Sequence, residues 1–358
     1  MTTRRAPIPM RRLLLALAAL SGCATPRAPG GPGAEAIRFP PEEVPASASE
    51  GLEGKNDAEL LAIGTAAYGA GDFRRAAAAL GRLADAFPAS PHAAGALRDA
   101  GRAHQQLGEW SLALERFRAL AAREGAPTGA ELTFRLAECR YHLGELAEAR
   151  DLLDGLVARQ DLGAGDRVRA LAQRGVVELE GGRPEEAERS LRLALSVWQE
   201  ASERERLDVY PAAQAQYYLG EVYRLRTEAV RLDPASSEAS LLRDLEDKTD
   251  LLLSAQGHYL RAIRLGEPDW AVAAGYRIGA LYEDLHREIA GAPLPPELSE
   301  EEAALYRAEL SGQIRVLVTK AIALYEQTLA AAQRAGVDNR FVEEAERALA
   351  RLRALLAP

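Results

Sequence analysis

The sequence predicts an all-α solenoid of stacked helix-turn-helix repeats that is continued by elongated C-terminal helices. The first observation behind this prediction is the nearly even spacing of four glycines, each followed by an alanine five residues later. The second is a bulky apolar residue four positions after each alanine, with a small residue seven positions before each glycine. The four sets are Gly64, Gly71, Ala76 and Leu80; Gly101, Gly108, Ala113 and Phe117; Ala137, Gly144, Ala149 and Leu153; and Gly175, Gly182, Ala187 and Leu191. A repeat of this period is typical of stacked copies of one small unit.

The second copy indicates what that unit is. Residues 94–107 carry apolar or small side chains at helical spacing, and Gly108 ends the helix because glycine adopts the left-handed conformation without a Cβ clash. Residues 109–122 then form a second helix, and the small residues Gly101 and Ala113 let the two helices approach closely. One hairpin cannot bury its own apolar face, so neighbouring hairpins are expected to stack.

These small and bulky residues at fixed places resemble the tetratricopeptide repeat. The stretches GDFRRAAAALGRLADAFPAS and LGEWSLALERFRAL match it best, and the resemblance covers four repeats within residues 57–198. It implies a right-handed α-solenoid. The sequence departs from the family at the eleventh position of each repeat, where an aromatic residue is usual and Ala67, His104, Arg140 and Glu178 stand instead.

The C-terminal part, residues 199–358, keeps the repeat but lengthens it. Two further repeat starts are visible at Gly220 and Gly279, and the steps from Gly175 to Gly220 and on to Gly279 exceed the spacing of the first four repeats. Helices are expected over residues 236–265, 270–289, 299–335 and 338–355, with Ser299 and Asp338 as N-caps and Gly336 as a stop. Such long helices either extend the solenoid as enlarged hairpins, close its core as a cap, or form a platform for another protein.

The N-terminal residues predict a lipoprotein signal sequence. Residues 1–22 contain four arginines followed by the apolar run Leu13–Leu20, which is too short to cross a bilayer as a helix. The run ends in Leu-Ser-Gly-Cys, which resembles the bacterial lipobox, so Cys23 is expected to receive a diacylglycerol. Met1 and Met10 are both candidate starts. A short N-terminal helix with a buried cysteine is the structural alternative.

The segment after the signal is expected to be a flexible tether. Residues 23–56 hold the lipid anchor and are rich in Pro, Gly and Ala, with too few bulky apolar residues to offset the entropy of ordering. Alanine rather than aspartate follows the cysteine, which favours the bacterial outer membrane. The chain is therefore expected to face the periplasm and to contact the membrane through its N-terminal lipid alone.

The charge balance argues against one class of partner. The formal charge of −9 becomes −13 once the four arginines of residues 1–22 are removed. An acidic chain of this kind is not expected to bind nucleic acid. After acylation of Cys23, Cys139 has no second cysteine to pair with, and its place inside a helix predicts a buried or half-buried thiol.

No motif in the sequence predicts catalysis. The five histidines lie far apart, and no HExxH, phosphate-binding glycine loop or Gly-x-Ser-x-Gly elbow occurs. We therefore expect no enzyme activity, no metal site and no cofactor.

The resemblance implies where a partner would bind. In this family the first helices of successive repeats line the concave face of the superhelix, and certain positions of each repeat point into it. The candidate partner-binding residues at these positions are Tyr68, Arg98, Arg102, Gln105, Glu131, Phe134, Glu138, Tyr141, Arg169, Tyr217, Glu221, Arg224 and Tyr276. Such a mixed, aromatic-rich surface suits an extended peptide or a partner helix. Arg98 and Arg102 together suit an acidic segment or a C-terminal carboxylate.

The function expected from these features is that of a non-catalytic, lipid-anchored periplasmic scaffold. Its partners would be envelope proteins or peptide segments, in outer-membrane assembly, Tol–Pal type coordination, secretion or motility machinery. An alternative is a module that binds peptidoglycan or another polysaccharide, and a third is an enzyme accessory subunit.

Overall fold

The computed structural model describes residues 46–123, 125, 129–231, 238–291 and 298–356, and every regular element in these ranges is an α-helix. The chain divides into two compact units between Arg183 and Pro184. We refer to described residues 46–183 as the N-terminal unit and to 184–356 as the C-terminal unit. The predicted signal sequence, Cys23 and the tether up to residue 45 lie outside the described residues.

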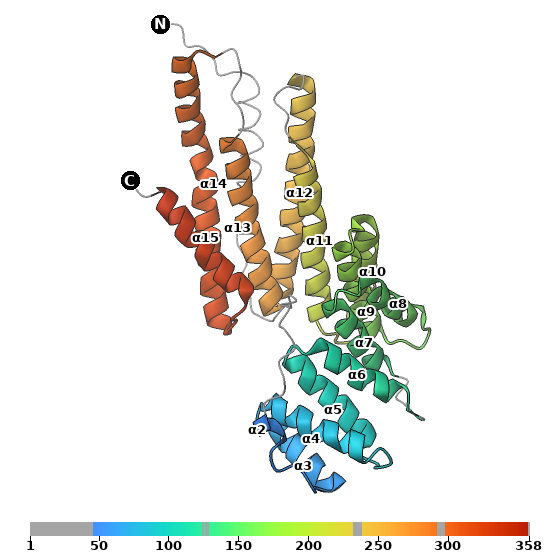
Figure 1. The fold of residues 1–358 in the computed structure, drawn as a ribbon. Coiled ribbons are helices and arrows are strands. Elements are labelled where there is room, and N and C mark those ends of the chain that lie inside the picture. The colour runs from blue at the N-terminus through green and yellow to red at the C-terminus, as the bar shows by residue number, and fades with distance from the viewer. Residues whose placement is uncertain (1–45, 124, 126–128, 232–237, 292–297, 357–358) are drawn as a thin grey trace. The chain divides into compact units, whose positions relative to one another are not determined.

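The N-terminal unit is a series of helix hairpins (Figure 1). Its helices are α2 (Ala46–Ser49), α3 (Asp57–Gly69), α4 (Phe73–Ala86), α5 (Ala93–Gln106), α6 (Trp110–Ala121), α7 (Ala130–His142), α8 (Leu146–Ala158) and α9 (Ala164–Glu180). Consecutive helices pack on one another from α3 to α9, and α2 packs on α4. The predicted architecture of stacked helix-turn-helix repeats is confirmed.

All four turn glycines predicted from the sequence have the left-handed backbone. Their φ values are +79° at Gly71, +72° at Gly108, +77° at Gly144 and +72° at Gly182. In the second repeat the amide of Gly108 donates to the carbonyl of Gln105 at 3.0 Å, and the amide of Glu109 donates to that of His104 at 2.9 Å. The same pair of bonds recurs at the other three turns. This is a Schellman motif, which needs a residue that tolerates positive φ.

The departure from the family at the eleventh repeat position has a structural counterpart. His104 occupies this position in the second repeat, and its Nδ1 lies 2.6 Å from Oε2 of Glu109 across the turn. Arg140 occupies it in the third repeat and pairs with Glu145 in the same way. In these two repeats a polar link across the turn stands where the family usually has an aromatic ring.

Close approach within each hairpin explains the small residues of the first helices. A Cβ added to Gly64 would lie 2.5 Å from Cγ of Leu80, and one added to Gly101 would lie 2.6 Å from Cε1 of Phe117. We call such a pair of small and bulky residues a socket. The bulky residue of each socket is buried, and the core of the unit is a succession of small clusters from one hairpin to the next.

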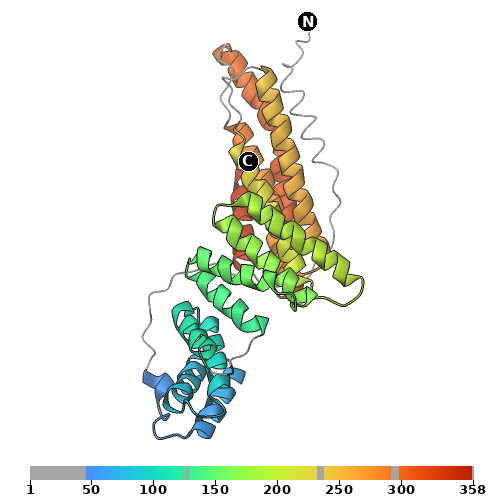
Figure 2. The same ribbon diagram turned by 90° about the vertical axis from the view of Figure 1, so that its right-hand side faces the viewer.

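The C-terminal unit consists of longer helices, and those of described residues 210–335 run side by side in Figures 1 and 2. They are α10 (Pro184–Ser202), α11 (Tyr210–Ala229), α12 (Glu238–Leu265), α13 (Pro268–Ala290), α14 (Glu300–Ala335) and α15 (Arg340–Leu356). The expected helices agree with these to within a few residues. Ser299 caps α14 in a reciprocal capping box with Glu302, and Gly336 ends it at φ +68°, as predicted. One expected cap is corrected: Asn339, not Asp338, accepts the amide of Phe341 at 3.0 Å.

The long hairpins repeat the socket of the short ones. A Cβ on Gly220 would overlap the ring of Tyr259, and one on Gly279 would lie 2.5 Å from Cε1 of Tyr325. A buried alanine precedes each tyrosine by four residues, as in the short repeats; these are Ala255 and Ala321. The two residues of a socket lie much farther apart in the sequence here than in the short hairpins. The long helices are therefore enlarged versions of the same hairpin.

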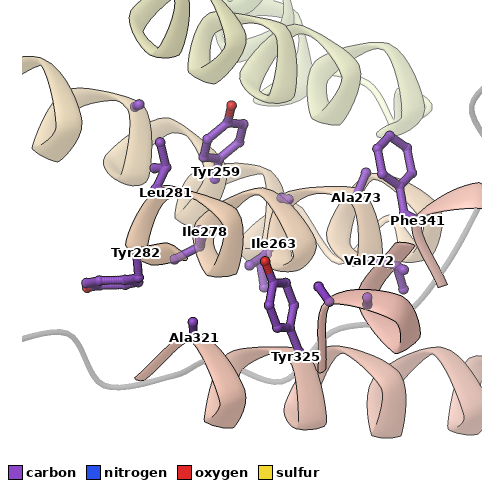
Figure 3. Packing of buried hydrophobic residues seen from close by; sticks show 14 of the residues in the cluster. Tyr259, Ile263, Val272, Ala273, Ile278, Leu281, Tyr282, Ala321, Tyr325 and Phe341 are labelled. Carbon is purple, nitrogen blue, oxygen red and sulfur yellow. The ribbon is translucent and has the colours of Figure 1, made fainter. Parts of the chain in front are cut away.

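The core of the C-terminal unit is one continuous cluster that extends from α11 to α15. Figure 3 shows Tyr259 of α12 and Tyr325 of α14 on either side of α13, which contributes Ile278, Leu281 and Tyr282. One of the alternatives drawn from the sequence was that the long helices close the core as a cap, and this cluster is consistent with it.

Candidate functional site

The candidate site of the N-terminal unit is a row of side chains on its first helices, which we call the first-helix face. It begins with Tyr68 of α3 and Arg102 of α5, whose guanidinium carbon lies 5.6 Å from the centre of the Tyr68 ring. This distance is within the range of a cation–π interaction. The structure thus brings together two candidates from neighbouring repeats.

The row continues from α5 to α7 through a polar cluster. Nε2 of Gln105 donates to Oε2 of Glu138 at 3.0 Å. Nη1 of Arg135 donates to Oε1 of Gln105 and to Oε2 of Glu138, both at 3.3 Å. Sequence reasoning did not select Arg135, although its spacing of three residues from Glu138 and four from Glu131 is a helical ion-pair signal.

Glu131 links α7 to α9. Its two oxygens accept from Nε of Arg135 at 2.7 Å and from Nη1 of Arg169 at 2.8 Å. Burial opposes ionisation of Glu131, but the two guanidinium groups outweigh it and lower the pKa of this carboxyl. The guanidinium of Arg169 also lies 4.0 Å from the centre of the Phe134 ring. Phe134 itself is fully buried, so it is a core residue and not an exposed partner contact.

Two further residues complete the face at its α9 end. The hydroxyl of Tyr141 donates to Oε1 of Glu180 at 2.7 Å. Burial, with Glu180 as the second cause, raises the pKa of Tyr141, and burial also raises that of Glu180. Glu180 was not a sequence candidate, because it lies at the end of its helix and outside the repeat positions used.

Arg98 and Arg102 are not free to act as an unpaired basic clamp. Arg98 forms a two-pronged bond with the neighbouring Asp99, with both N–O distances at 2.9 Å. Arg102 lies 3.8 Å from the same carboxylate. The pairing raises the pKa of Arg98. Their side chains remain 57% and 45% exposed, so they are accessible, but a partner's carboxylate would have to share or displace Asp99.

Three of the four candidates in the C-terminal unit, Tyr217, Glu221 and Arg224, belong to an interior network. Tyr217 is 2% exposed and Glu221 is 7% exposed. Tyr259 donates to Glu221, and Nε of Arg277 lies 3.0 Å from Oε1 of Glu221 and 3.2 Å from the hydroxyl of Tyr217. Nε of Arg224 completes the network at 3.2 Å from Oε2 of Glu221. Burial, followed by the charge of Glu221, raises the pKa of both tyrosines.

This network corrects two of the sequence candidates. Tyr217 and Glu221 are buried because α12 and α13 cover this side of α11, and a buried charge is stable only when it is paired and hydrogen-bonded. Tyr276 is half-buried, with its ring centre 5.8 Å from that of Tyr325 and 5.9 Å from that of Phe341. Burial raises the pKa of Tyr276 to about 12.

The repeat matches the model of a known family. Residues 61–104 and 98–165 match the family model described as the tetratricopeptide repeat. Residues 61–165 therefore form tetratricopeptide repeats. The match lies within the N-terminal unit and includes most of the first-helix face. No curated protein sequence matches the chain significantly.

Several solved structures are similar to this chain. The MamA protein is 17% identical over 57% of this chain and 94% of its own, with a TM-score of 0.39. A chain of the APC/C hetero-tetramer Cut9–Hcn1 is 16% identical over 83% of this chain and 42% of its own, with a TM-score of 0.47. A tetratricopeptide repeat protein from Parabacteroides merdae is 17% identical over 83% and 98%, with a TM-score of 0.39. We draw no functional argument from similarities at this level.

The described ranges of the chain contain no group of three or more His, Cys, Asp or Glu side chains arranged to hold a metal ion. Within the same ranges, no helix is both long and apolar enough to span a bilayer. Cys139 is buried, as expected, and burial raises the pKa of its thiol to about 12.

Proposed function

We propose that this chain is a non-catalytic scaffold, anchored by a lipid on Cys23 to the bacterial outer membrane, whose repeats bind a partner protein in the periplasm. Tetratricopeptide repeats are protein-interaction scaffolds, which supports the general part of this proposal. The lipobox at residues 20–23 supports the anchor and the location.

The continuity of the first-helix face is the reason for proposing it as the binding surface. Its side chains contact one another from α3 to α9, so the surface is continuous across four repeats. Most of its arginines and carboxylates are held by partners within the face, so their geometry is set before a ligand arrives, which reduces the entropy lost on binding. Arg98, Arg102, Glu131 and Glu180 are exposed charges of this face. We propose that an extended segment with both acidic and basic residues binds along this row.

Site-specific photo-crosslinking in intact cells tests the binding surface. A photoreactive phenylalanine analogue at Arg102 is expected to crosslink one or a few envelope proteins, which mass spectrometry would identify. The matched control carries the analogue at Asp151, an exposed residue of the second helix α8. If both positions yield the same products, or if Arg102 yields glycan only, the proposed surface is not the binding site.

Metabolic labelling tests the anchor independently of the partner. The Cys23→Ser variant is expected to lose incorporation of labelled palmitate and to leave the outer-membrane fraction. Cys139→Ser is the control, because its thiol is buried and it should retain both properties. Labelling that persists in Cys23→Ser would contradict the lipoprotein assignment.

The aromatic residues favour a protein partner over a glycan. Sugar-binding surfaces generally present flat aromatic side chains to solvent. Here Trp270 is 3% exposed and Trp198 is half-buried. Trp110 is half-buried and stacks on His142 with ring centres 3.7 Å apart and planes 9° apart. None of the three tryptophans is therefore presented as a stacking platform.

A further inference from the structure

A second surface of the N-terminal unit is a groove between the second helices α4 and α6. Its volume is about 660 Å³. Small residues of α4 and an exposed leucine of α6 form its floor: Ala77, Ala78, Gly81 and Leu112. No residue of the first-helix face lines it, so the groove is separate from the proposed partner site. Such small residues allow the backbone of an extended chain to lie close to a helix.

The rim of this α4–α6 groove carries one more positive charge than its own carboxylates can balance. Nη1 of Arg116 lies 2.6 Å from Oδ1 of Asp85, and Nη1 of Arg74 lies 3.8 Å from Oε1 of Glu109. Arg82 is the third arginine of the lining and is exposed. Among the described residues that line the groove, Asp85 and Glu109 are the only carboxylates. An apolar segment with acidic residues would complement this surface.

The chain itself enters the fold at one end of this groove. The first described helix, α2, packs on α4, and both Ser49 and Leu52 line the groove. Leu52 is 1% exposed, and the carbonyl of Glu50 accepts a bond from Nη1 of Arg75 at 3.3 Å. The preceding residues are therefore joined in sequence to a helix that packs on α4.

The preceding sequence has the composition that the groove requires. Residues 37–45 read IRFPPEEVP and combine the apolar Phe39 with the acidic pair Glu42 and Glu43, which outnumber the one arginine of the segment. We propose that this segment binds in the α4–α6 groove, with Phe39 on the floor and the two glutamates beside Arg82. The two consecutive prolines after Phe39 favour the extended conformation that a narrow groove accepts.

Residues 37–45 are long enough to reach the α4–α6 groove from the start of α2. The seven residue-to-residue steps from Phe39 to Ala46 span up to roughly 23 Å when extended, whereas the axes of packed helices are about 8–10 Å apart. Binding of residues 37–45 shortens the free tether to residues 24–36. Such binding needs neither acylation of Cys23 nor a partner on the first-helix face.

Disulfide trapping in the full-length chain tests this inference. Phe39→Cys is combined with Ala78→Cys on the groove floor, and Cys23→Ser removes the other reactive thiol. The control combines Phe39→Cys with Ala66→Cys, which replaces an exposed residue of α3 outside the groove. Oxidation is expected to join the two thiols of the groove pair within one chain at least about tenfold faster than it joins the control pair. Adding Arg82→Glu should slow the first reaction severalfold and leave the control reaction unchanged.

Three outcomes would overturn the inference. Equal rates for the two cysteine pairs would show an unbound tether that samples both faces. A bond that forms mainly between two chains, and whose rate rises with protein concentration, would make a second copy the occupant of the groove. A rate that is unaffected by Arg82→Glu would remove the charge complementarity on which the choice of segment rests. All three are read from purified protein, so they are independent of the crosslinking and labelling tests of the proposed function.

Discussion

The N-terminal and C-terminal units are built on the same socket but use it differently. In the N-terminal unit a glycine accepts a leucine or phenylalanine from the next helix, and a Schellman turn joins the two helices. In the C-terminal unit a glycine accepts a tyrosine that comes much later in the sequence, from a longer helix. The core changes accordingly, from a succession of small clusters to one continuous cluster.

This difference teaches that the socket, and not the helix length, is the constant part of the repeat. The tyrosines also add a polar end to the socket, which the leucine and phenylalanine lack. Tyr259 bonds to Glu221 and Tyr325 to Glu283 at 3.1 Å. Glu221, next to the Gly220 socket, is buried, whereas Glu138, next to the Ala137 socket, is 35% exposed. Four predictions test this contrast, from the largest expected effect to the smallest.

Glu221 and Glu138 occupy equivalent positions, directly after the small residue of a socket. Glu221→Ala leaves Arg277 and the Tyr259 hydroxyl without their shared partner inside the fold, so it should lower the free energy of unfolding by about 3 kcal/mol. Glu138→Ala, at a side chain 35% exposed, should lower it by less than about 1 kcal/mol. Native-state hydrogen exchange of α11 and α7 provides the measurement. Similar losses from the two changes would contradict the contrast.

The sockets themselves should differ in their tolerance of a methyl group. Gly220→Ala should destabilise the C-terminal unit by about 1–3 kcal/mol, because the ring of Tyr259 is held by Glu221 and cannot move aside. Gly64→Ala faces the side chain of Leu80 and should be milder, since the third repeat already pairs Ala137 with Leu153. Chemical denaturation followed by hydrogen exchange in each unit would rank the two. A smaller effect at Gly220 would show that the tyrosine is not fixed.

The turns of the short hairpins should be sensitive to the same change for a different reason. Gly144→Ala forces a side chain into positive φ and should reduce stability by roughly 1–2 kcal/mol. Gly155→Ala is the matched control, because Gly155 lies inside α8 with no atom near its added Cβ and ordinary helical φ. It should raise stability by about 0.5–1 kcal/mol. Opposite signs at two glycines of the same repeat are the expected result, measured by thermal unfolding.

Acid should weaken the N-terminal unit more than the C-terminal unit. Burial lowers the pKa of His142 to about 4, so between pH 6.5 and 4 the unfolded chain binds a proton that the folded chain does not. Stability is thus retained above pH 6.5 and lost as the pH falls, by about 1 kcal/mol at pH 5.5. In the C-terminal unit burial lowers the pKa of His258 to about 3, but it raises those of Glu267 to about 7 and Asp269 to about 6.

Glu267 and Asp269 change the stability of the fold in the opposite direction to His258. Their raised pKa values stabilise the fold at a pH below the pKa of an unfolded carboxyl, near 4, and this stabilisation is lost as the pH rises through 6 to 7. They offset His258 on acidification. His142→Phe, which keeps a ring against Trp110, should flatten the acid response of the N-terminal unit, whereas His92→Gln at an exposed position should not. Hydrogen exchange at pH 7 and pH 5.5, corrected for intrinsic rates, is the measurement. An equal acid response in both units would refute the assignment.

The fold could be predicted from the sequence because its signals are local. A glycine in a turn and a small residue at a fixed distance before a bulky one report on one hairpin each, and both recur. The enlarged hairpins were harder, since their sockets join residues on helices of unequal length. Gly220 and Gly279 were nevertheless visible as repeat starts, and the boundaries of α12 and α14 follow from Gly266, Ser299 and Gly336.

The candidate site could be predicted only in part. Repeat position tells which way a side chain points from its own helix, and Arg102 and Glu131 indeed lie on the exposed first-helix face. It does not tell whether a later helix covers that side chain. Tyr217 and Glu221 were expected at the surface, yet they are covered by residues 60 and 38 positions away in sequence. Partners at such separations leave no periodic trace in the chain.

The sockets at Gly220–Tyr259 and Gly279–Tyr325 have a consequence for how this protein can change in evolution. Each glycine lies towards the middle of its helix, so the stretch beyond it can gain or lose turns in both helices of a hairpin without disturbing the register below. Two turns added to each helix would lengthen the arm by about 11 Å. Paired insertions can thus change the length of the C-terminal half, while the glycine–tyrosine sockets that hold its helices together stay the same.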